Sequence, residues 1–426
     1  MKLSSRIVTA TLAVASITSF PSTVFATSGY FRHGYGHNSA AMAGATTATA
    51  QDAMAGATNP AVITQLDNQS SVNVSLFNPL REFQVTGQPQ SAFSNPVLEM
   101  PLALGTTESD ENYFAIPTYG YKTRFENGWD FNFVAYGQGG MNTSYSESVF
   151  GGGKTGVDMA QLFFSFGFAK QFSESTAVGI APILGYQRFE VEGLAAFAGM
   201  SQNPSAVSNR GYADAWGYGV RLGLTHKLSE KLTFGLSYQT ILDFESFDEY
   251  EGLFADDGLF DIPTTYNLGF AYERGDVTWA LDYQHIDYSE VASVANSMMP
   301  AFGQIMMGNP DYLLGKKQGP GFGWESMDVY KLGVAMKDGK NTWRAGISYG
   351  EQPIPESEVL FNIIAPGVQE WHYTLGYEFA LQDGESISVS FMYSPENSVK
   401  GIHPANQQQW IELSMEQFEL TIGYNF

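Results

Sequence analysis

The chain repeats one pattern, in which strands that alternate apolar and polar residues are joined by short and long connections in turn. The clearest strand is the last, where Phe418, Leu420, Ile422, Tyr424 and Phe426 alternate with polar residues and glycine. Short polar turns lie at 173–175, 229–231, 274–276, 337–341 and 382–385, and long connections at 193–211, 248–261, 291–324 and 352–369. Such alternation gives each strand one apolar and one polar face. The pattern predicts an all-β chain of antiparallel strands.

The composition indicates whether the apolar faces of the strands contact lipid or a protein core. Charged residues make up 15% of the chain and aromatic residues 14%, whereas soluble domains carry roughly 25% charged residues. Strands of a membrane barrel turn apolar residues to lipid and polar residues to the lumen. We therefore predict a transmembrane antiparallel β-barrel of about 14 strands, an even number as bacterial barrels require. The alternative is a soluble β-sandwich whose edge strands have the same alternation.

The first 26 residues have the features of a secretory signal peptide. Lys2 and Arg6 are followed by an apolar stretch over 7–20 and by the sequence Val24-Phe25-Ala26, which suits signal cleavage. The alternative is a short membrane anchor, but the apolar stretch is too short to span a bilayer. A signal peptide followed by a barrel predicts the outer membrane of a Gram-negative bacterium. The absence of cysteine excludes disulfide and thiol chemistry, and a net charge of −23 argues against a nucleic-acid partner.

The segment 29–63 differs from everything that follows it. It consists mainly of Ala, Gly, Ser and Thr, contains neither Lys nor Glu, and lacks strand alternation. It cannot bury enough apolar surface to fold alone, so we expect it to lie inside the barrel, with Asn59-Pro60-Ala61 ending it. This divides the chain into a signal peptide (1–26), a hatch in the lumen (27–66) and a barrel with long extracellular loops (67–426). The alternative is a flexible secreted leader that plugs nothing.

This segment also carries a family resemblance. The motif formed by Gly44-Ala45, Asp52-Ala53 and Asn59-Pro60-Ala61 resembles the N-terminal hatch of the FadL-type outer-membrane transporters of long-chain fatty acids and other hydrophobic compounds. The resemblance implies a monomeric, plugged barrel for passive uptake: loops capture a hydrophobic ligand, a pocket above the hatch binds it, and it leaves sideways through the wall. The expected partners are this ligand, outer-membrane lipid, lipopolysaccharide and the barrel assembly machinery. The last of these is expected because the terminal Phe426 resembles the signal that this machinery reads.

Glycines interrupt the expected third strand. The sequence Tyr136-Gly137-Gln138-Gly139-Gly140 lies inside the strand expected over 129–146. Clustered glycines in a strand mark a bulge or bend. FadL-type barrels resemble this in an inward kink of the third strand, which opens the wall laterally; the resemblance assigns that kink to Gly137, Gly139 and Gly140. The alternative is that these glycines only relieve crowding against the hatch.

Two of the long loops are unusually apolar. The candidate ligand-binding residues in them are Leu194, Phe197 and Met200 in the first, and Met298, Phe302 and Met306 in the second, where the spacing is helical. Exposed apolar loops favour a binding role, and methionine adapts to ligands of varied shape. The family's capture groove lies between the third and fourth loops, but here the fourth (248–261) is short and acidic, so we expect the fifth to replace it. The alternative is a lid in which the loops pack on one another.

One arginine resembles a family ligand contact. Arg188 follows Tyr186-Gln187, similar to an aromatic-x-Arg sequence at which the family holds a ligand carboxylate, a role suited to a bidentate guanidinium. A second basic residue is common near the start of the tenth strand, where this chain has Met327. Its absence leaves room for a neutral hydrophobic ligand. The alternative for Arg188, as for the other lumenal cations Arg221, Lys331 and Arg344, is an ion pair with an acidic residue of the lumen.

No catalytic or metal-binding pattern emerges. Asp282, His285 and Asp287 are close in sequence, but in a strand the first two point to opposite faces, and no Gly-x-Ser-x-Gly motif occurs. His33 and His37 lie in the hatch and could in principle bind a metal. We expect no enzyme activity, cofactor or metal. The rival functions are a nonspecific porin, which would lack a hatch and conduct ions, and a surface adhesin or structural barrel, which would have no ligand pocket.

Overall fold

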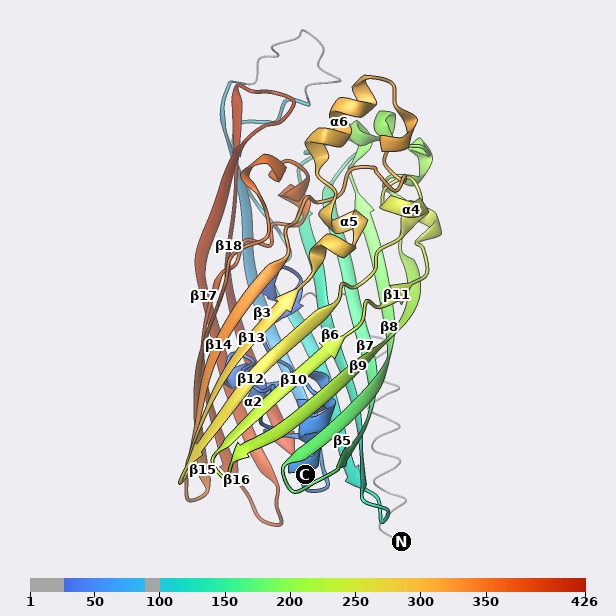
Figure 1. Ribbon diagram of the computed structural model, residues 1–426. Helices are drawn as coiled ribbons and strands as arrows, with labels where there is room; N and C mark the ends of the chain where they lie inside the picture. Colours follow the sequence, from blue (N-terminus) through green and yellow to red (C-terminus); the bar gives the residue numbers. More distant parts are fainter. Residues whose placement is uncertain (1–26, 89–99) are drawn as a thin grey trace.

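The computed structural model describes residues 27–88 and 100–426, and within these ranges fourteen antiparallel strands close into a barrel (Figure 1). Each strand pairs with its sequence neighbour, and the last pairs with the first, so the predicted fold class is confirmed. The barrel strands are β3 (Gln69–Gly87), β5 (Phe114–Arg124), β6 (Trp129–Tyr145), β7 (Thr155–Gln171), β8 (Thr176–Glu192), β9 (Ala213–Ser229), β10 (Leu232–Gln239), β12 (Thr265–Arg274), β13 (Val277–Ile286), β14 (Met327–Asp338), β15 (Asn341–Gly350), β16 (Trp371–Ala380), β17 (Ser386–Ile402) and β18 (Gln409–Asn425).

The remaining elements are short and lie before the barrel or in its loops. Before the barrel are β1 (Thr27–Ser28), β2 (Phe31–Arg32), α2 (Gly36–Ala41), η1 (Ala53–Ala57) and η2 (Pro60–Gln65). The loops contain β4 (Gly105–Glu108), η3 (Ala195–Met200), η4 (Pro204–Ala206), β11 (Asp243–Phe244), η5 (Asp248–Tyr250), α4 (Ala255–Gly258), η6 (Tyr288–Glu290), α5 (Ala292–Ala295), α6 (Met298–Met306), η7 (Pro310–Tyr312), η8 (Glu356–Glu358) and η9 (Phe361–Ile364). Within the described ranges, every helix is too short or too polar to cross a bilayer.

The outer face of the barrel is apolar in the middle and aromatic towards both ends. Large aliphatic side chains are exposed around the wall, including Val74, Leu184, Leu281, Leu332 and Ile422. Aromatic residues flank this belt, with Trp129, Trp279 and Trp343 near the short turns and Tyr266, Tyr330 and Tyr373 near the long loops. An apolar band between two aromatic girdles is the surface that a bilayer requires of a β-barrel.

The first barrel strand is longer than expected. The cleanest alternation in the sequence covers 70–78 and predicts a strand that ends there, before a long polar loop, but β3 continues to Gly87 and pairs with β18 from Ser71 onward. The reason is that the alternation persists, since Phe83 and Val85 still point inward and are buried. Strands β3, β17 and β18 therefore rise above the rest of the wall, at the left of Figure 1.

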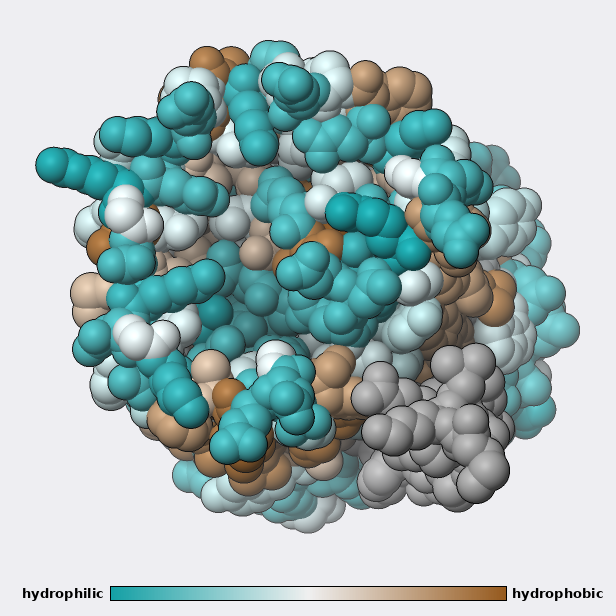
Figure 2. All heavy atoms as spheres, turned by 90° about the horizontal axis from the view of Figure 1, so that it is seen from below, coloured by the Kyte–Doolittle hydropathy of each residue, from teal (hydrophilic) through white to brown (hydrophobic). Residues whose placement is uncertain are grey.

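Residues 27–66, the hatch, lie inside the lower half of the barrel (blue in Figure 1). Most of their side chains are buried against the inner wall. Seen from the end that carries the short turns, the molecule is mainly hydrophilic and is hollowed near its centre (Figure 2). The hatch therefore separates a polar lower opening from the upper lumen. The expected signal peptide, 1–26, lies outside the described residues.

Candidate functional site

Two residues of the hatch motif hold its short helices in place. The Asp52 carboxylate accepts a hydrogen bond from the Met54 amide at 2.8 Å and caps η1, and the Asn59 side chain caps η2 by accepting from the Ala61 amide at 2.9 Å. Asn59 also donates to the Thr47 carbonyl at 2.7 Å. Pro60 was expected to end the segment, but it starts the last turn, because proline at a first helical position needs no amide donor.

Glycines of the barrel wall make room for the hatch. Ten strands each carry a glycine at which a Cβ would lie closer than 3.0 Å to a hatch atom: Gly120, Gly139, Gly179, Gly223, Gly235, Gly269, Gly333, Gly346, Gly376 and Gly423. Within the hatch, Gly44 has a φ of +79°, and its Cβ would lie 1.7 Å from the His33 carbonyl oxygen, so glycine here lets two segments of the hatch pack on each other. Small residues on both sides therefore let the hatch backbone lie directly against the wall.

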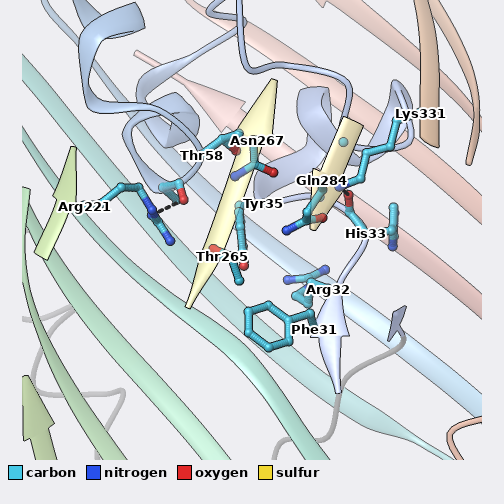
Figure 3. A pocket seen from close by; sticks show the side chains of 13 residues that line it. Phe31, Arg32, His33, Tyr35, Thr58, Arg221, Thr265, Asn267, Gln284 and Lys331 are labelled. Carbon is cyan, nitrogen blue, oxygen red and sulfur yellow. Dashed lines mark hydrogen bonds between the residues drawn. The ribbon is translucent and has the colours of Figure 1, made fainter. Parts of the chain in front are cut away.

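A small, largely polar pocket lies between the upper side of the hatch and the wall (Figure 3). The hatch contributes Phe31, Arg32, His33, Gly34, Tyr35, Gly44, Ala57 and Thr58, and the wall contributes Arg221, Thr265, Asn267, Gln284 and Lys331. The Arg221 guanidinium donates to the Ala57 carbonyl, and the Lys331 ammonium donates to the His33 carbonyl at 3.2 Å. Wall cations thus bind hatch carbonyls.

The cations of this pocket are incompletely neutralised. Arg32 pairs with Glu419 at 2.7 Å. Among the described residues, however, no carboxylate lies within ion-pair distance of Arg221 or Lys331, although both side chains are buried. Arg221 has only neutral partners, which include the Tyr136 hydroxyl at 3.3 Å and Gln239. A buried cation without a counter-ion is costly, so the pocket attracts anions.

Aromatic rings fill the lumen above this pocket. Tyr30 of the hatch lies 5.2 Å from Tyr288, 5.8 Å from Trp324 and 6.0 Å from Phe260, as measured between ring centroids. These rings belong to one continuous buried cluster that extends up to the loops. Met327, which stands where a basic residue was looked for, points inward and is part of the same cluster. The upper lumen is therefore apolar directly above a cationic floor.

The long loops pack on one another over the barrel mouth. Loop 3 (193–212) and loop 5 (287–326) are joined by a hydrogen bond from the Leu314 amide to the Met200 carbonyl at 2.9 Å. Loop 5 is joined to loop 6 (351–370) by a bond from the Trp324 indole to Asn362 at 2.6 Å. Leu194, Phe197 and Met298 are buried in the central cluster, and Met200 and Phe302 pack against it, whereas Met306 is 52% exposed. The loops form a lid, and ligand capture by these residues stays a prediction.

Arg188 is not in the lumen, so its expected location is wrong. It has the same parity in β8 as Ile180 and Leu184, whose side chains are exposed on the outer face. Its guanidinium lies 3.5 Å from the Asp158 carboxylate and stacks over the Tyr212 ring. Strand geometry gives the physical reason, because residues four apart always share a face. Arg188 pairs with an acidic residue as the alternative proposed, but on the outside of the barrel.

Strand β6 carries an irregularity at its glycines. Its register with β7 shifts between Gly137 and Gly140, which inserts one extra residue into β6. A Cβ on Gly139 would lie 1.8 Å from the Tyr30 carbonyl oxygen, so Gly139 also lets the hatch approach the wall. The glycines therefore form a bulge and also relieve crowding against the hatch, so the two alternatives hold together at this position. The use of the bulge as a lateral opening stays a prediction.

The histidines and acidic residues singled out in the sequence have structural partners. Asp282 points inward and accepts from the Thr47 amide at 2.8 Å, whereas His285 points outward and lies 2.6 Å from Asp328. His33 stacks on His372, and His37 lies 3.7 Å from Asp52. In the part of the chain that the structure describes, no three His, Cys, Asp or Glu side chains converge as metal ligands would.

A comparison with protein families decides the identity of this plugged barrel. The family described as "Outer membrane protein transport protein (OMPP1/FadL/TodX)" matches residues 22–421. The chain belongs to the FadL/TodX family. It is therefore an outer-membrane β-barrel of a family that consists of transport channels for hydrophobic compounds. A comparison with curated proteins found no match.

Solved structures of FadL/TodX proteins share this fold at low sequence identity. The Pseudomonas putida toluene transporter TodX is 17% identical, with a TM-score of 0.64 over 92% of this chain and 98% of that one. A Pseudomonas aeruginosa FadL homologue is 13% identical, with a TM-score of 0.68 over 93% and 99%. The Ralstonia pickettii toluene transporter TbuX is 15% identical, with a TM-score of 0.60 over 92% and 98%. At these identities the likeness concerns the fold.

Arg221 and Lys331 were expected in the lumen, but they were not among the candidate ligand-binding residues. Nothing in the sequence around Arg221 and Lys331 separates them from Arg344, another lumenal cation, which pairs with Glu378 at 3.0 Å. Strand parity puts both on the lumenal side, as expected, since each alternates with outward residues such as Leu222 and Leu332. The level of the hatch along the strands, which decides that they meet it, was not readable from the sequence.

Proposed function

We propose that this FadL/TodX barrel takes up long-chain fatty acids, which enter between the loops, cross the apolar upper lumen and leave through the wall at β6. The observation that carries this proposal is the aromatic cluster directly above a pocket with two buried cations, Arg221 and Lys331, neither of which makes an ion pair within the described residues. An apolar chamber over a cationic floor matches a molecule with an apolar tail and a carboxylate. Transport is passive, driven by the gradient and by consumption downstream.

The cations give such a ligand a way to loosen the hatch. Arg221 donates to Ala57 and Lys331 donates to His33, and both acceptors are neutral hatch carbonyls. A carboxylate is a stronger acceptor for a guanidinium or ammonium than a carbonyl is. A fatty acid that reached the pocket would therefore compete with the hatch for both cations and free its upper side to move.

A neutral aromatic hydrocarbon is the second candidate ligand. Met327 stands in the lumen where a second basic residue was looked for, and the cluster above the pocket is rich in aromatic rings. Two of the similar solved structures are toluene transporters. Such a ligand would occupy the cluster without using Arg221 or Lys331.

Binding of oleate and toluene to the purified protein separates the two candidates. The variant Arg221→Gln should weaken oleate binding about tenfold, because hydrogen bonds to charged groups contribute about 1.5 kcal/mol or more. Toluene binding should stay unchanged. Lys400→Gln is the matched control, since Lys400 lies on the outer side of β17 in an ion pair with Glu412. Oleate binding that is indifferent to Arg221→Gln, or tighter binding of toluene than of oleate, would favour the neutral ligand.

A further inference from the structure

The barrel wall is interrupted between β5 and β6. The ladder between these strands runs from Arg124–Asp130 up to Tyr119–Ala135 and stops there. Above Ala135, β6 continues for ten residues with pairing to β7 alone, and within the described ranges its next backbone contact on the β5 side is the bond from the Asp110 amide to the Ser144 carbonyl at 2.7 Å. Residues 136–143 therefore form a stretch of β6 without a strand partner towards β5, called the window below, and the glycine bulge lies in it, although its described residues are buried.

Arg81 of β3 lies at the upper rim of this window. Its side chain points inward and is 3% exposed. The guanidinium donates to the Asn142 carbonyl of β6 and to the Glu111 carbonyl in the segment that leads into β5, and it lies 5.5 Å from the Phe114 ring centroid. Among the described residues, Arg81 makes no ion pair, and its buried Nε atom has no hydrogen-bond partner. Arg81 is thus a buried cation that bridges the two sides of the window.

The two rims of the window differ in polarity. Asn142 and the residue after Glu111, Asn112, have side-chain oxygens that are buried and that lack a hydrogen-bond partner among the described residues. Below Arg81, Phe77, Phe114, Ile116 and Met392 form a separate apolar cluster on the inner wall. Buried polar groups in proteins are normally satisfied. The unsatisfied Nε atom of Arg81 and the two unsatisfied amide oxygens of the segments that Arg81 bridges therefore indicate a place for a further polar group, with an apolar surface beneath it.

We propose that Arg81, Asn112 and Asn142 form an exit site that binds the carboxylate of an amphipathic ligand while its tail lies along the lower cluster and passes through the window. The carboxylate accepts from the guanidinium, and each carboxamide can turn its amino group towards it, because the oxygen and nitrogen of an Asn side chain are interchangeable in position. The exit site uses strands β3 and β6, whereas the lumenal pocket cations come from β9 and β14. This proposal rests on the proposed function. It adds that ligands with a carboxylate head group are selected at the window.

The height of the exit site along the barrel suits this role. On β3, Asn78 pairs with Phe418, an outward aromatic residue that stacks on Tyr393 near the loop end of the wall. Arg81 lies three residues beyond Asn78 towards the loops. Aromatic girdles mark the boundary between the apolar and polar layers of a membrane. A ligand held at Arg81 would therefore keep its carboxylate in the polar layer and lower its tail into lipid, as it must lie after release.

The test compares uptake of oleate with uptake of oleyl alcohol, which has the same chain without the acid. Both probes are given to cells that produce the full-length protein and lack any other route for fatty-acid uptake. Arg81→Gln should lower oleate uptake about tenfold, as expected from the loss of a charged hydrogen bond, and should leave oleyl alcohol uptake unchanged. Arg81→Lys keeps the charge and should retain most oleate uptake. Lys400→Gln is the control for loss of a cation elsewhere.

The outcomes separate the exit site from a structural bridge. Equal losses for both probes, or a loss in Arg81→Lys as large as in Arg81→Gln, would overturn the proposal, because bridging the carbonyls would then be the only role of Arg81. Heat-dependent migration in gels shows whether each barrel is folded. If Arg81→Gln does not fold, Asn142→Leu tests the site, since Arg81 contacts only the backbone of Asn142; unchanged oleate selectivity in that variant would overturn the proposal. Wild-type cells that take up no oleate would refute the proposed function itself.

Discussion

At the scale of single residues, the barrel depends on glycines that face the hatch. A Cβ at Gly235 would lie 2.3 Å from the Thr47 carbonyl oxygen of the hatch, whereas a Cβ at Gly199, in loop 3, would meet nothing within 4 Å. Backbone atoms cannot yield as the end of a side chain can. The wall glycines therefore set the distance between hatch and wall, and each should tolerate no side chain.

Gly235→Ala should displace the hatch locally. We expect a cost of about 1–3 kcal/mol from overpacking and more frequent ion-conducting openings in planar bilayers, because the hatch edge beside β10 would no longer fit. Gly199→Ala is the matched control and should behave as the wild type. Wild-type stability and conductance in Gly235→Ala would show that the hatch does not pack tightly against β10.

Asp261 gives loop 4 a pH dependence. Burial raises the pKa of its carboxyl from 3.8 to about 6, although the carboxylate accepts from the Phe244 amide at 2.8 Å. Since the folded pKa lies above the unfolded value, this group favours the folded loop below about pH 4 and loses that contribution as pH rises through about 6. Hydrogen exchange of loop 4 should therefore accelerate between pH 5 and pH 7 beyond the intrinsic base catalysis, in rough proportion to the ionised fraction. Asp261→Asn should remove this additional acceleration of exchange. If the acceleration persists in the variant, another titrating group causes it.

Single residues of the site were predictable to different degrees. Asp52 and Asn59 stood out because capping residues have a local signature, and their spacing in the hatch motif is fixed. Arg188 was misplaced although the information was present, since counting by twos from Leu184 puts it on the lipid side. Arg81 carried no signal of its own, because its partners Asn142 and Glu111 are distant in sequence and the contacts are made to backbone carbonyls.

At the scale of elements, the glycine cluster of β6 has two structural roles, a bulge in the strand and a close approach to the hatch. The bulge between Gly137 and Gly140 lies in the part of the strand that has no β5 partner. Gly139 also admits the Tyr30 carbonyl, which connects the bulge to the aromatic cluster of the lumen. The clustered glycines in the sequence predict the bulge. The contact of Gly139 with Tyr30 of the hatch could not be predicted, because it depends on the three-dimensional arrangement.

Replacing Gly139 and Gly140 with valine should block transport while leaving ligand binding intact. Valine favours regular strand pairing and resists the backbone conformations that glycine allows, and closing the ladder satisfies more backbone groups in lipid. Binding and uptake of oleate are the two measurements. Because a side chain at 139 would also strike Tyr30, Gly140→Val alone is the control that leaves this contact in place. Wild-type uptake by both folded variants would contradict lateral exit and favour a path past the hatch.

Helix α6 is the second element with a testable role. Its N-terminus is held by loop 6, since the Met298 amide donates to the Glu358 carboxylate at 2.8 Å, whereas Met306 and the following Met307 are 52% and 80% exposed. Shortening 298–307 should weaken the apparent affinity for ligand without preventing barrel assembly. The sharper change is Met306→Gln with Met307→Gln, which keeps the anchor.

The double methionine change should raise the oleate concentration needed for half-maximal uptake by about three- to tenfold, because burying even one or two methylene groups contributes about 0.8 kcal/mol each. Lys316→Gln, an exposed change in the same loop, is the control. Unchanged uptake at low oleate concentration would leave the methionines as parts of a lid and remove their capture role.

At the scale of the whole molecule, the fold was far more predictable than the pathway. Alternation, turn asymmetry and the small-residue segment sufficed for a plugged barrel of fourteen strands, because each reports a local constraint imposed by lipid or by a confined lumen. The window between β5 and β6 and the cations that face the hatch depend on strand tilt, on register and on the level at which the hatch rests. None of these is set by a short stretch of sequence.

The hatch itself is the subject of the last prediction. Deleting 29–57 should leave a folded barrel with higher ion conductance. Assembly should survive because the fourteen strands close through their own ladder, from β3 round to β18, without hydrogen bonds from the hatch backbone within the strands. Wall groups such as Asp282 and Arg221, which now contact the hatch, would be solvated by water that enters the lumen. Conductance in planar bilayers is the measurement, with heat-dependent gel migration as the check on folding. The control deletes 298–307 from the lid and should leave conductance unchanged, because the hatch still closes the lower lumen. If the hatch deletion conducts no better than the wild type, or if the lid deletion alone opens the channel, the apolar cluster beneath the loops and not the hatch would be the seal.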